Sequence, residues 1–208
     1  MTMKKLIIFD WDDVFTLGST TGYKVCYHKA LAGVGVYLDP EVEEQRLKTK
    51  WGTNHIEELR ALLVENPALV EEAGKLYEEH LFGETYINAL SIIPGTIELL
   101  ERLNEKYILA LATGVHPDLL RNIVMPKFRI PDVFSQLASG YDFEDPTLCK
   151  PNPHSANIIM EKQNVSREES LMVGDAANDM LMAKAAGIDS IAVLTGHLNR
   201  QQAQEIGV

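Results

Sequence analysis

The chain has 208 residues, of which 46% are hydrophobic and 24% charged, as is ordinary for a globular protein with a sizeable core. Its 30 acidic residues outnumber its 19 lysines and arginines, and the resulting net charge of −11 argues against nucleic acid as a partner. Two cysteines, Cys26 and Cys149, are too few for a disulfide framework, and no apolar stretch reaches the length of a membrane span. We therefore expect a cytoplasmic protein with no membrane partner.

The first predicted element is a buried strand over residues 6–9, which ends at two carboxylates, Asp10 and Asp12. Buried carboxylates this close repel each other and shift each other's pKa unless a cation neutralises them. The pair therefore indicates a metal site or a division of labour between a nucleophile and a general acid.

The stretch from about residue 18 to residue 92 contains no run typical of a strand and predicts successive helices. The first is expected over residues 23–31, the second from Asp39-Pro40, the third from near Asn54 and the fourth from Asn66-Pro67. A wholly helical insertion after the first strand indicates a lid.

Strands and helices alternate in the rest of the chain. Strands are expected at 108–112, 171–173 and 191–194, with a weaker one at 134–138, and helices at 96–103, 117–124, 152–160 and 176–186. This alternation predicts βαβ units and a doubly wound parallel sheet, an α/β fold of Rossmann-like type.

Ligands of such sheets bind beyond the carboxyl ends of the strands. Three of the predicted strands end at polar groups, namely Asp10, Thr113-Gly114 and Gly174-Asp175, and the run at 191–194 ends at Thr195-Gly196. We expect Asp10, Thr113 and Asp175 to share one crevice although they lie far apart in the sequence.

The chain resembles the haloacid dehalogenase-like (HAD) hydrolase superfamily in four segments that occur in the family's order. These are Asp10-Trp11-Asp12-Asp13-Val14, Thr113-Gly114, Lys150-Pro151-Asn152-Pro153 and the segment 174–179. The helical insertion is similar to the cap of phosphoglycolate phosphatases and β-phosphoglucomutases. The resemblance implies a core domain of residues 1–17 and 93–208 and a helical cap domain of residues 18–92.

The resemblance also implies roles for the carboxylates. Asp10 is the expected nucleophile, which forms an aspartyl-phosphate, and Asp12 the expected general acid and base. Mg²⁺ prefers oxygen ligands, and its expected ligands are Asp10, Asp12 (through its backbone carbonyl), Asp175 and Asp179. Asp179 is equally placed to orient Lys150.

Thr113, Gly114 and Lys150 are the expected partners of the phosphoryl group. The hydroxyl of Thr113, the amide of Gly114 and the charge of Lys150 suit phosphoryl oxygens. Two positions depart from the family's pattern, since Asp13 stands where glycine is usual and Val14 where threonine is frequent. Asp tolerates left-handed backbone, so Asp13 is compatible with the turn.

Substrate specificity is expected in the loop 48–55 of the cap, where Lys48, Trp51 and His55 offer charge and an aromatic face. A solvated loop, with Trp51 packed for stability, is the alternative.

These features predict a monomeric, Mg²⁺-dependent phosphatase of a small phosphorylated metabolite. The sequence leaves three alternatives open: a phosphomutase, a phosphonate hydrolase using a cap lysine, and a protein that binds a phosphorylated ligand without catalysis.

Overall fold

The structure, a computed structural model, describes residues 2–50 and 54–207. The described chain divides into two units, a core unit of Met1–Leu17 with Ile92–Val208 and a helical unit of Gly18–Ser91. Two short strands, β2 (Thr16–Leu17) and β3 (Ser91–Ile92), pair with each other where the chain leaves and re-enters the core unit.

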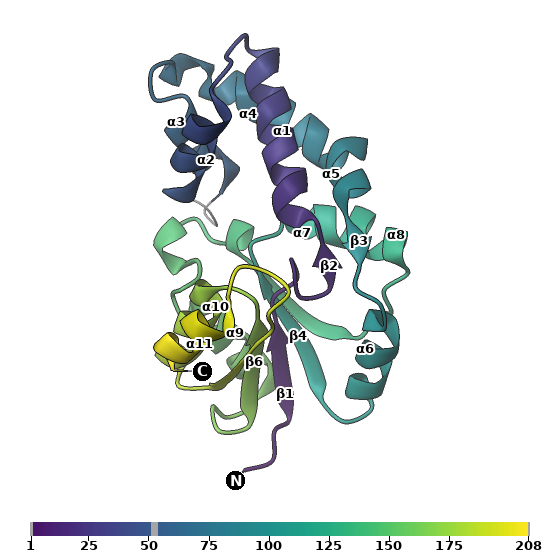
Figure 1. Cartoon of the computed structure of the whole chain (residues 1–208). Coiled ribbons are helices and arrows are strands. Elements are labelled where there is room, and N and C mark those ends of the chain that lie inside the picture. Colours follow the sequence, from purple (N-terminus) through teal and green to yellow (C-terminus); the bar gives the residue numbers. More distant parts are fainter. Residues whose placement is uncertain (1, 51–53, 208) are drawn as a thin grey trace. The chain divides into compact units, whose positions relative to one another are not determined.

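A parallel sheet of five strands, counted over the described residues, forms the centre of the core unit in the order β5-β4-β1-β6-β7 (Figure 1). Its strands are β1 (Leu6–Phe9), β4 (Ile108–Thr113), β5 (Phe134–Ser139), β6 (Ser170–Gly174) and β7 (Asp189–Ala192). β1 lies between β4 and β6, so that Phe9 is opposite Leu111 on one side and Val173 on the other. The carboxyl ends of these three strands therefore meet at one edge, where the polar residues follow.

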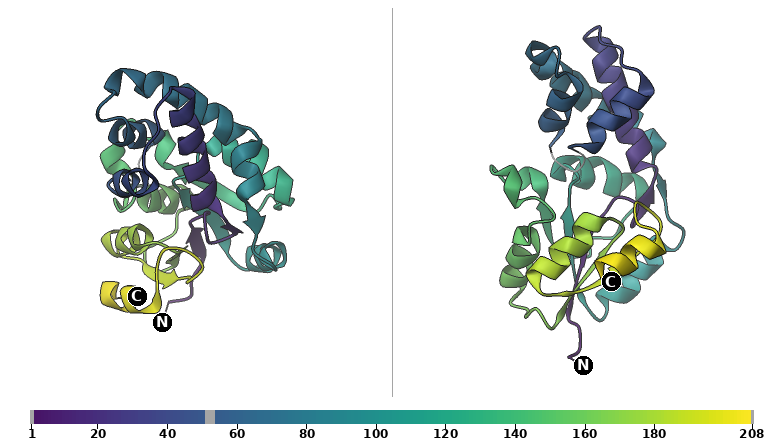
Figure 2. Two further views of the ribbon diagram at one scale, coloured as in Figure 1. Left: turned by 45° about the horizontal axis from the view of Figure 1, so that its top comes forward. Right: turned by 60° about the vertical axis from the view of Figure 1, so that its left-hand side comes forward.

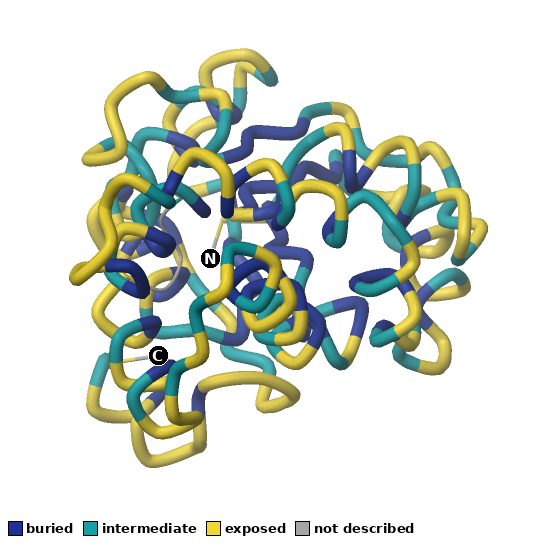
Figure 3. Tube along the Cα trace, turned by 90° about the horizontal axis from the view of Figure 1, so that it is seen from above, coloured by how far each residue is buried: buried dark blue, intermediate teal, exposed yellow. Residues whose placement is uncertain are grey.

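Helices cover both faces of this sheet, with α6 on the side opposite α9 and α10 (Figures 1 and 2). The helical segments of the core unit are α6 (Thr96–Asn104), α7 (Pro117–Leu119), a π-helical turn (Leu120–Val124), α8 (Met125–Phe128), 3-10 turns at Gly140–Asp142 and Pro146–Leu148, α9 (His154–Gln163), α10 (Ala177–Ala186) and α11 (Arg200–Ile206). On one face Leu6 and Ile8 pack with Ile159 of α9 and Met182 of α10 in a single apolar cluster. Figure 3 colours the chain by burial, and the central strands β1 and β4 are almost wholly buried.

Aromatic rings pack around the turn that follows β1. Phe15 lies 5.0 Å from Phe9, 5.4 Å from Trp11 and 6.0 Å from Phe134, measured between ring centroids. Trp11 is fully buried, and its indole Nε1 has no hydrogen-bond partner among the described residues. This packing holds the backbone of the 10–15 turn, on which Asp10 and Asp12 lie.

The helical unit consists of α1 (Ser19–Gly33), α2 (Pro40–Lys48), α3 (His55–Leu62), a 3-10 turn (Pro67–Leu69), α4 (Val70–Phe82) and α5 (Glu84–Ala89). Helix α1 begins four residues before its predicted start at residue 23. The predicted caps of α2 and α3 are present, because the side chain of Asp39 accepts from the amide of Glu41 and that of Asn54 from the amide of Glu57. None of the described helices meets the length and hydropathy that crossing a membrane requires.

One predicted strand is displaced. The apolar run at 191–194 indicated a strand there, whereas β7 spans Asp189–Ala192. β7 is an edge strand whose Ile191 is 49% exposed, so that pairing with β6, and not burial of the apolar residues, determines where it lies. The residues after Ala192 are thereby freed to form a loop.

Candidate active site

Asp10 lies directly beyond the carboxyl end of β1. Its backbone amide donates to the carbonyl of Val173 at 3.0 Å, which continues the pairing of β1 with β6. Its Oδ1 accepts from the amide of Trp11 at 2.7 Å, and the residue is only 8% exposed. The carboxylate is thus held in one orientation, with its second oxygen directed to Lys150.

Lys150 joins two of the carboxylates. Its Nζ lies 3.0 Å from Oδ2 of Asp10 and 2.7 Å from Oδ1 of Asp179. Burial opposes the charge of this ammonium group, but the charges of Asp10 and Asp179 outweigh it and raise the pKa of Lys150 above its ordinary value. Lys150 therefore carries a permanent positive charge in the site.

The carboxylates of Asp10, Asp175 and Asp179 converge, with one oxygen of each within 4.8 Å of the others. Burial, and next the charge of Asp10, raise the pKa of Asp175 from 3.8 to about 7. Burial also raises the pKa of Asp179, although Lys150 opposes the shift. Three buried carboxylates exceed the single charge of Lys150, so that this all-oxygen donor set fits a hard divalent cation such as Mg²⁺.

Asp179 reaches this cluster from the first turn of α10. Its Oδ2 accepts from the amide of Ala176 at 3.1 Å, so that the side chain folds back over the start of its own helix. A Cβ at Gly174 would overlap that carboxylate and lie 2.5 Å from its Cγ. The absence of a side chain at Gly174 is therefore what allows Asp179 to approach the end of β6.

Thr113 is the last residue of β4, and Gly114 follows it at the same edge of the sheet. Thr113 is 3% exposed, and its hydroxyl oxygen accepts from the amide of Val115 at 3.2 Å. A Cβ at Gly114 would meet no atom within 4 Å, so that the backbone there borders open space. Gly114 is exposed and carries no side chain, so that an anion has room to approach its backbone.

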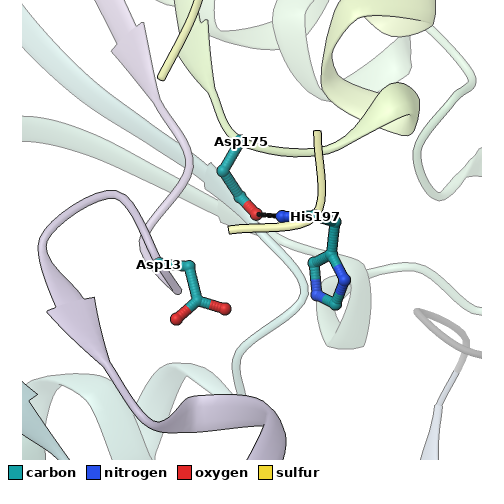
Figure 4. Close-up of side chains that lie close together, drawn as sticks. All are labelled: Asp13, Asp175 and His197. Atoms are coloured by element: carbon teal, nitrogen blue, oxygen red, sulfur yellow. Dashed lines mark hydrogen bonds between the residues drawn. The ribbon is translucent and has the colours of Figure 1, made fainter. Parts of the chain in front are cut away.

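Asp12 and Asp13 lie in the turn after Asp10. Asp12 forms an isolated bridge with Thr16, which closes the turn. Asp13 takes a φ of +55°, the left-handed conformation that explains why glycine is usual at this position. The residue is 9% exposed, and its carboxylate lies near Asp175 and His197, with one ligand atom of each within 4.8 Å of the others (Figure 4).

His197 and its loop were not among the predicted site residues. The backbone amide of His197 donates to Oδ2 of Asp175 at 3.0 Å, as the dashed line in Figure 4 shows. A signal was available, because the run at 191–194 ends at Thr195-Gly196 on the same side of the sheet as the other strand ends. No pattern in the sequence predicts that the loop after these residues returns to Asp175.

The predicted specificity residues lie in the helical unit. Lys48, at the end of α2, is 72% exposed at its side chain, and its Nζ lies 3.2 Å from Glu44. His55 is buried, stacks on Tyr77 at 5.2 Å between ring centroids and lies 3.4 Å from Glu78. Trp51 lies outside the described residues.

Comparison with known proteins places this chain in a family. The model of the haloacid dehalogenase-like hydrolases matches residues 4–187. Phosphoglycolate phosphatase of Vibrio cholerae is 34% identical over 202 residues, which cover 93% of this chain and 85% of that protein. That of Vibrio vulnificus strain CMCP6 is 33% identical over 203 residues, with the same shares covered.

Solved structures agree on the fold. A protein from Haemophilus somnus, described as a predicted phosphoglycolate phosphatase, matches with a TM-score of 0.80 at 23% identity over 95% of this chain and 88% of that one. A haloacid dehalogenase-like hydrolase from Streptococcus pneumoniae matches with a TM-score of 0.77 at 20% identity over 100% of this chain and 92% of that one. The predicted α/β fold is confirmed, and the chain belongs to the haloacid dehalogenase-like hydrolases as an enzyme of the phosphatase type.

Proposed function

We propose that this protein hydrolyses a small phosphomonoester in a Mg²⁺-dependent reaction that passes through an aspartyl-phosphate on Asp10. The observation that carries the proposal is the Asp10–Lys150–Asp179 chain of ion pairs, which lies beside Asp175 at the carboxyl edge of the sheet. Phosphoryl transfer needs a fixed nucleophile beside positive charge: Asp10 is held in place, Lys150 supplies one positive charge, and the acidic cluster would hold Mg²⁺ as a second source.

Asp10 is the proposed nucleophile. Its Oδ1 is held by the amide of Trp11, so that Oδ2 remains to attack phosphorus in line with the leaving oxygen. The P–O bond to the leaving group breaks as the new bond to Asp10 forms. Asp12 donates a proton to the leaving alkoxide and later removes one from the water that hydrolyses the aspartyl-phosphate.

Thr113, Gly114 and Lys150 are proposed to bind the phosphoryl oxygens. The hydroxyl of Thr113 and the amide of Gly114 donate hydrogen bonds, and Lys150 supplies charge. Asp10, Asp175 and Asp179, with the backbone carbonyl of Asp12, are the proposed ligands of Mg²⁺. When bound, the ion neutralises charge on the phosphoryl oxygens.

We propose that the helical unit acts as a cap whose loop 48–55 selects the ester. Lys48 offers an exposed positive charge at the end of α2, and Trp51 is three residues further along the sequence. His55 is the first residue of α3 and contributes by fixing this end of the loop, because its ring stacks on Tyr77 and lies close to Glu78. Because the curated relatives are phosphoglycolate phosphatases, we place 2-phosphoglycolate first among the candidate substrates.

The proposal is tested by measuring phosphate release from a panel of phosphomonoesters that includes 2-phosphoglycolate and an aryl phosphate, in Mg²⁺ and in EDTA. We expect release that requires Mg²⁺ and that Asp10→Asn lowers by about 10³-fold or more. Asp132→Asn, an exposed carboxylate outside the site, is the matched control and should retain full activity. Release that persists in EDTA, or none from any ester, would contradict the proposal.

A further inference from the structure

The loop 193–198, which follows β7, runs beside the end of β6. The amide of Val193 donates to the carbonyl of Gly174 at 2.9 Å, and the amide of Leu198 donates to the carbonyl of Asp175 at 2.8 Å. Both ends of this loop are thus hydrogen-bonded to the backbone at the end of β6, the first end to Gly174 and the second to Asp175. The roles proposed above leave the loop without a function.

The middle of the loop holds the carboxylate of Asp175 itself. The backbone amide of His197 donates to its Oδ2 at 3.0 Å (Figure 4). A carboxylate with one oxygen fixed loses most of its freedom to rotate, and a backbone donor is held more rigidly than a long side chain. The orientation of Asp175 is therefore determined by the path of the loop.

Gly196 makes this approach possible. A Cβ at this position would overlap Oδ2 of Asp175, and would lie 2.6 Å from its Cγ and 2.8 Å from Cβ of Asp13. The backbone of the loop therefore passes between the two acidic residues at a distance that excludes any side chain.

Thr195 extends the contact to the turn that follows β1. Its hydroxyl donates a hydrogen bond to the backbone carbonyl of Asp13, whose φ is positive. The loop thus connects the turn that carries Asp10 and Asp12 with the end of β6 that carries Asp175. Residues 182 positions apart in the sequence are joined by this bond.

We propose that the loop 193–198 is a positioning element of the metal site, in which Gly196 and the amide of His197 orient Asp175 and Thr195 holds the adjoining turn. The inference rests on the proposed function, since it takes Asp175 to be a ligand of Mg²⁺. Residues that orient a ligand without touching the metal are worth about 10- to 100-fold in metal affinity.

Gly196→Ala tests the steric part of the inference in the full chain. We expect the Kd for Mg²⁺, measured by calorimetry without substrate, to rise at least about tenfold, because the new methyl group displaces Asp175. Gly33→Ala is the matched control: it also replaces a glycine, but the atoms nearest to its new Cβ all belong to the flexible side chain of Leu76 in the helical unit, whose Cδ1 would have to shift. The Kd of this control should equal that of the wild type.

Two further variants keep the glycine. Thr195→Val replaces the hydroxyl with a methyl group of similar size, and the loss of one hydrogen bond should raise the Kd for Mg²⁺ by about fivefold. His197→Ala retains the backbone amide and should leave the Kd within about threefold of the wild type. A loss of affinity in His197→Ala as large as in Gly196→Ala would assign the role to the imidazole and overturn the assignment to the amide.

These outcomes separate the inference from the proposed function. A wild type that shows Mg²⁺-dependent phosphate release, combined with unchanged Mg²⁺ affinity in Gly196→Ala or in Thr195→Val, would overturn the inference alone. A wild type that binds Mg²⁺ but releases no phosphate would overturn the proposed function alone, provided that the affinities of the variants fall as expected. A wild type that binds no Mg²⁺ would overturn both. If Gly196→Ala fails to fold, which circular dichroism detects, Thr195→Val decides.

Discussion

Asp175 illustrates at the level of single residues how a binding site reduces stability. Its carboxylate is buried beside Asp10, and these two causes raise its pKa from 3.8 to about 7. The folded protein therefore holds this proton to a higher pH than the unfolded chain does. As the pH rises from about 4 to about 7, the free energy of unfolding of the metal-free protein falls, by roughly 2–4 kcal/mol if Asp175 acts alone.

Asp175→Asn should therefore stabilise the metal-free protein at about pH 8, because it removes a repelling charge while its amide oxygen still accepts from His197. Urea unfolding in EDTA would measure this gain, which should shrink as the pH falls to about 4 and below, because Asp175 is then protonated in the folded protein and increasingly protonated in the unfolded chain. Added Mg²⁺ should stabilise the wild type and not the variant. A variant less stable than the wild type at pH 8 would refute this explanation.

Lys150 has the opposite effect, since it compensates Asp10 and Asp179. Lys150→Met should lower the free energy of unfolding by about 3–5 kcal/mol at neutral pH, because it leaves two buried carboxylates without their cation. The double variant with Asp179→Asn removes one of those charges and should recover part of the loss. Chemical denaturation of both variants in EDTA checks this, and a double variant no more stable than Lys150→Met would count against it.

The sequence predicted that Asp10, Thr113 and Asp175 lie at one edge of the sheet, because parallel strands end there: Asp10 and Asp175 each follow a strand, and Thr113 is the last residue of one. It did not predict that Asp13 and His197 lie near Asp175. Their proximity depends on the path of the loop 193–198, which no hydrophobic period describes. The packing of aromatic rings around Trp11 also depends on residues distant in the sequence, and the sequence did not predict it.

Individual helices and strands were predictable where a local signal exists. Asp39 and Asn54 are side-chain caps, and both helices begin where these residues predict. Elements without such signals have other boundaries than predicted. Helix α1 starts before its apolar pattern begins, and β7 lies where it pairs with β6 and not where the apolar run 191–194 lies. Pairing and packing override local preference in both cases.

The cap of α3 yields a prediction with an internal control. Asn54→Ala should lower the free energy of unfolding by about 1 kcal/mol, because its side chain accepts from the amide of Glu57 at 3.0 Å. Asn66→Ala, before the 3-10 turn at Pro67–Leu69, is the control, since the side chain of Asn66 makes no capping bond there. Equal losses in the two variants, measured by urea unfolding, would argue against the cap.

For the molecule as a whole, the division into two units separates chemistry from the proposed selectivity. Every residue proposed to bind Mg²⁺ or the phosphoryl group lies in the core unit, and the residues proposed to select the ester lie in the helical unit. The sequence predicted an insertion of this kind because its helical periodicity interrupts an alternating α/β pattern. It offered no physical signal for which ester is bound.

A shortened chain, in which a Gly/Ser linker replaces residues 19–90, should accordingly bind Mg²⁺ with a Kd within about threefold of the full chain. It should also lose discrimination between phosphomonoesters. Calorimetry and the same ester panel would measure both effects, after circular dichroism has established that the shortened chain is folded. Loss of Mg²⁺ binding in a folded shortened chain would show that the helical unit contributes to the metal site.

The most direct test of the central claim is a rapid-quench experiment with a ³²P-labelled phosphomonoester that the wild type hydrolyses. We predict transient labelling of the protein, located by peptide mapping at Asp10, which decays as phosphate is released. Asp12→Asn should retain the label for longer, and Asp10→Asn should acquire none. Turnover by the wild type without any protein-bound label, together with undiminished turnover by Asp10→Asn, would contradict the claim.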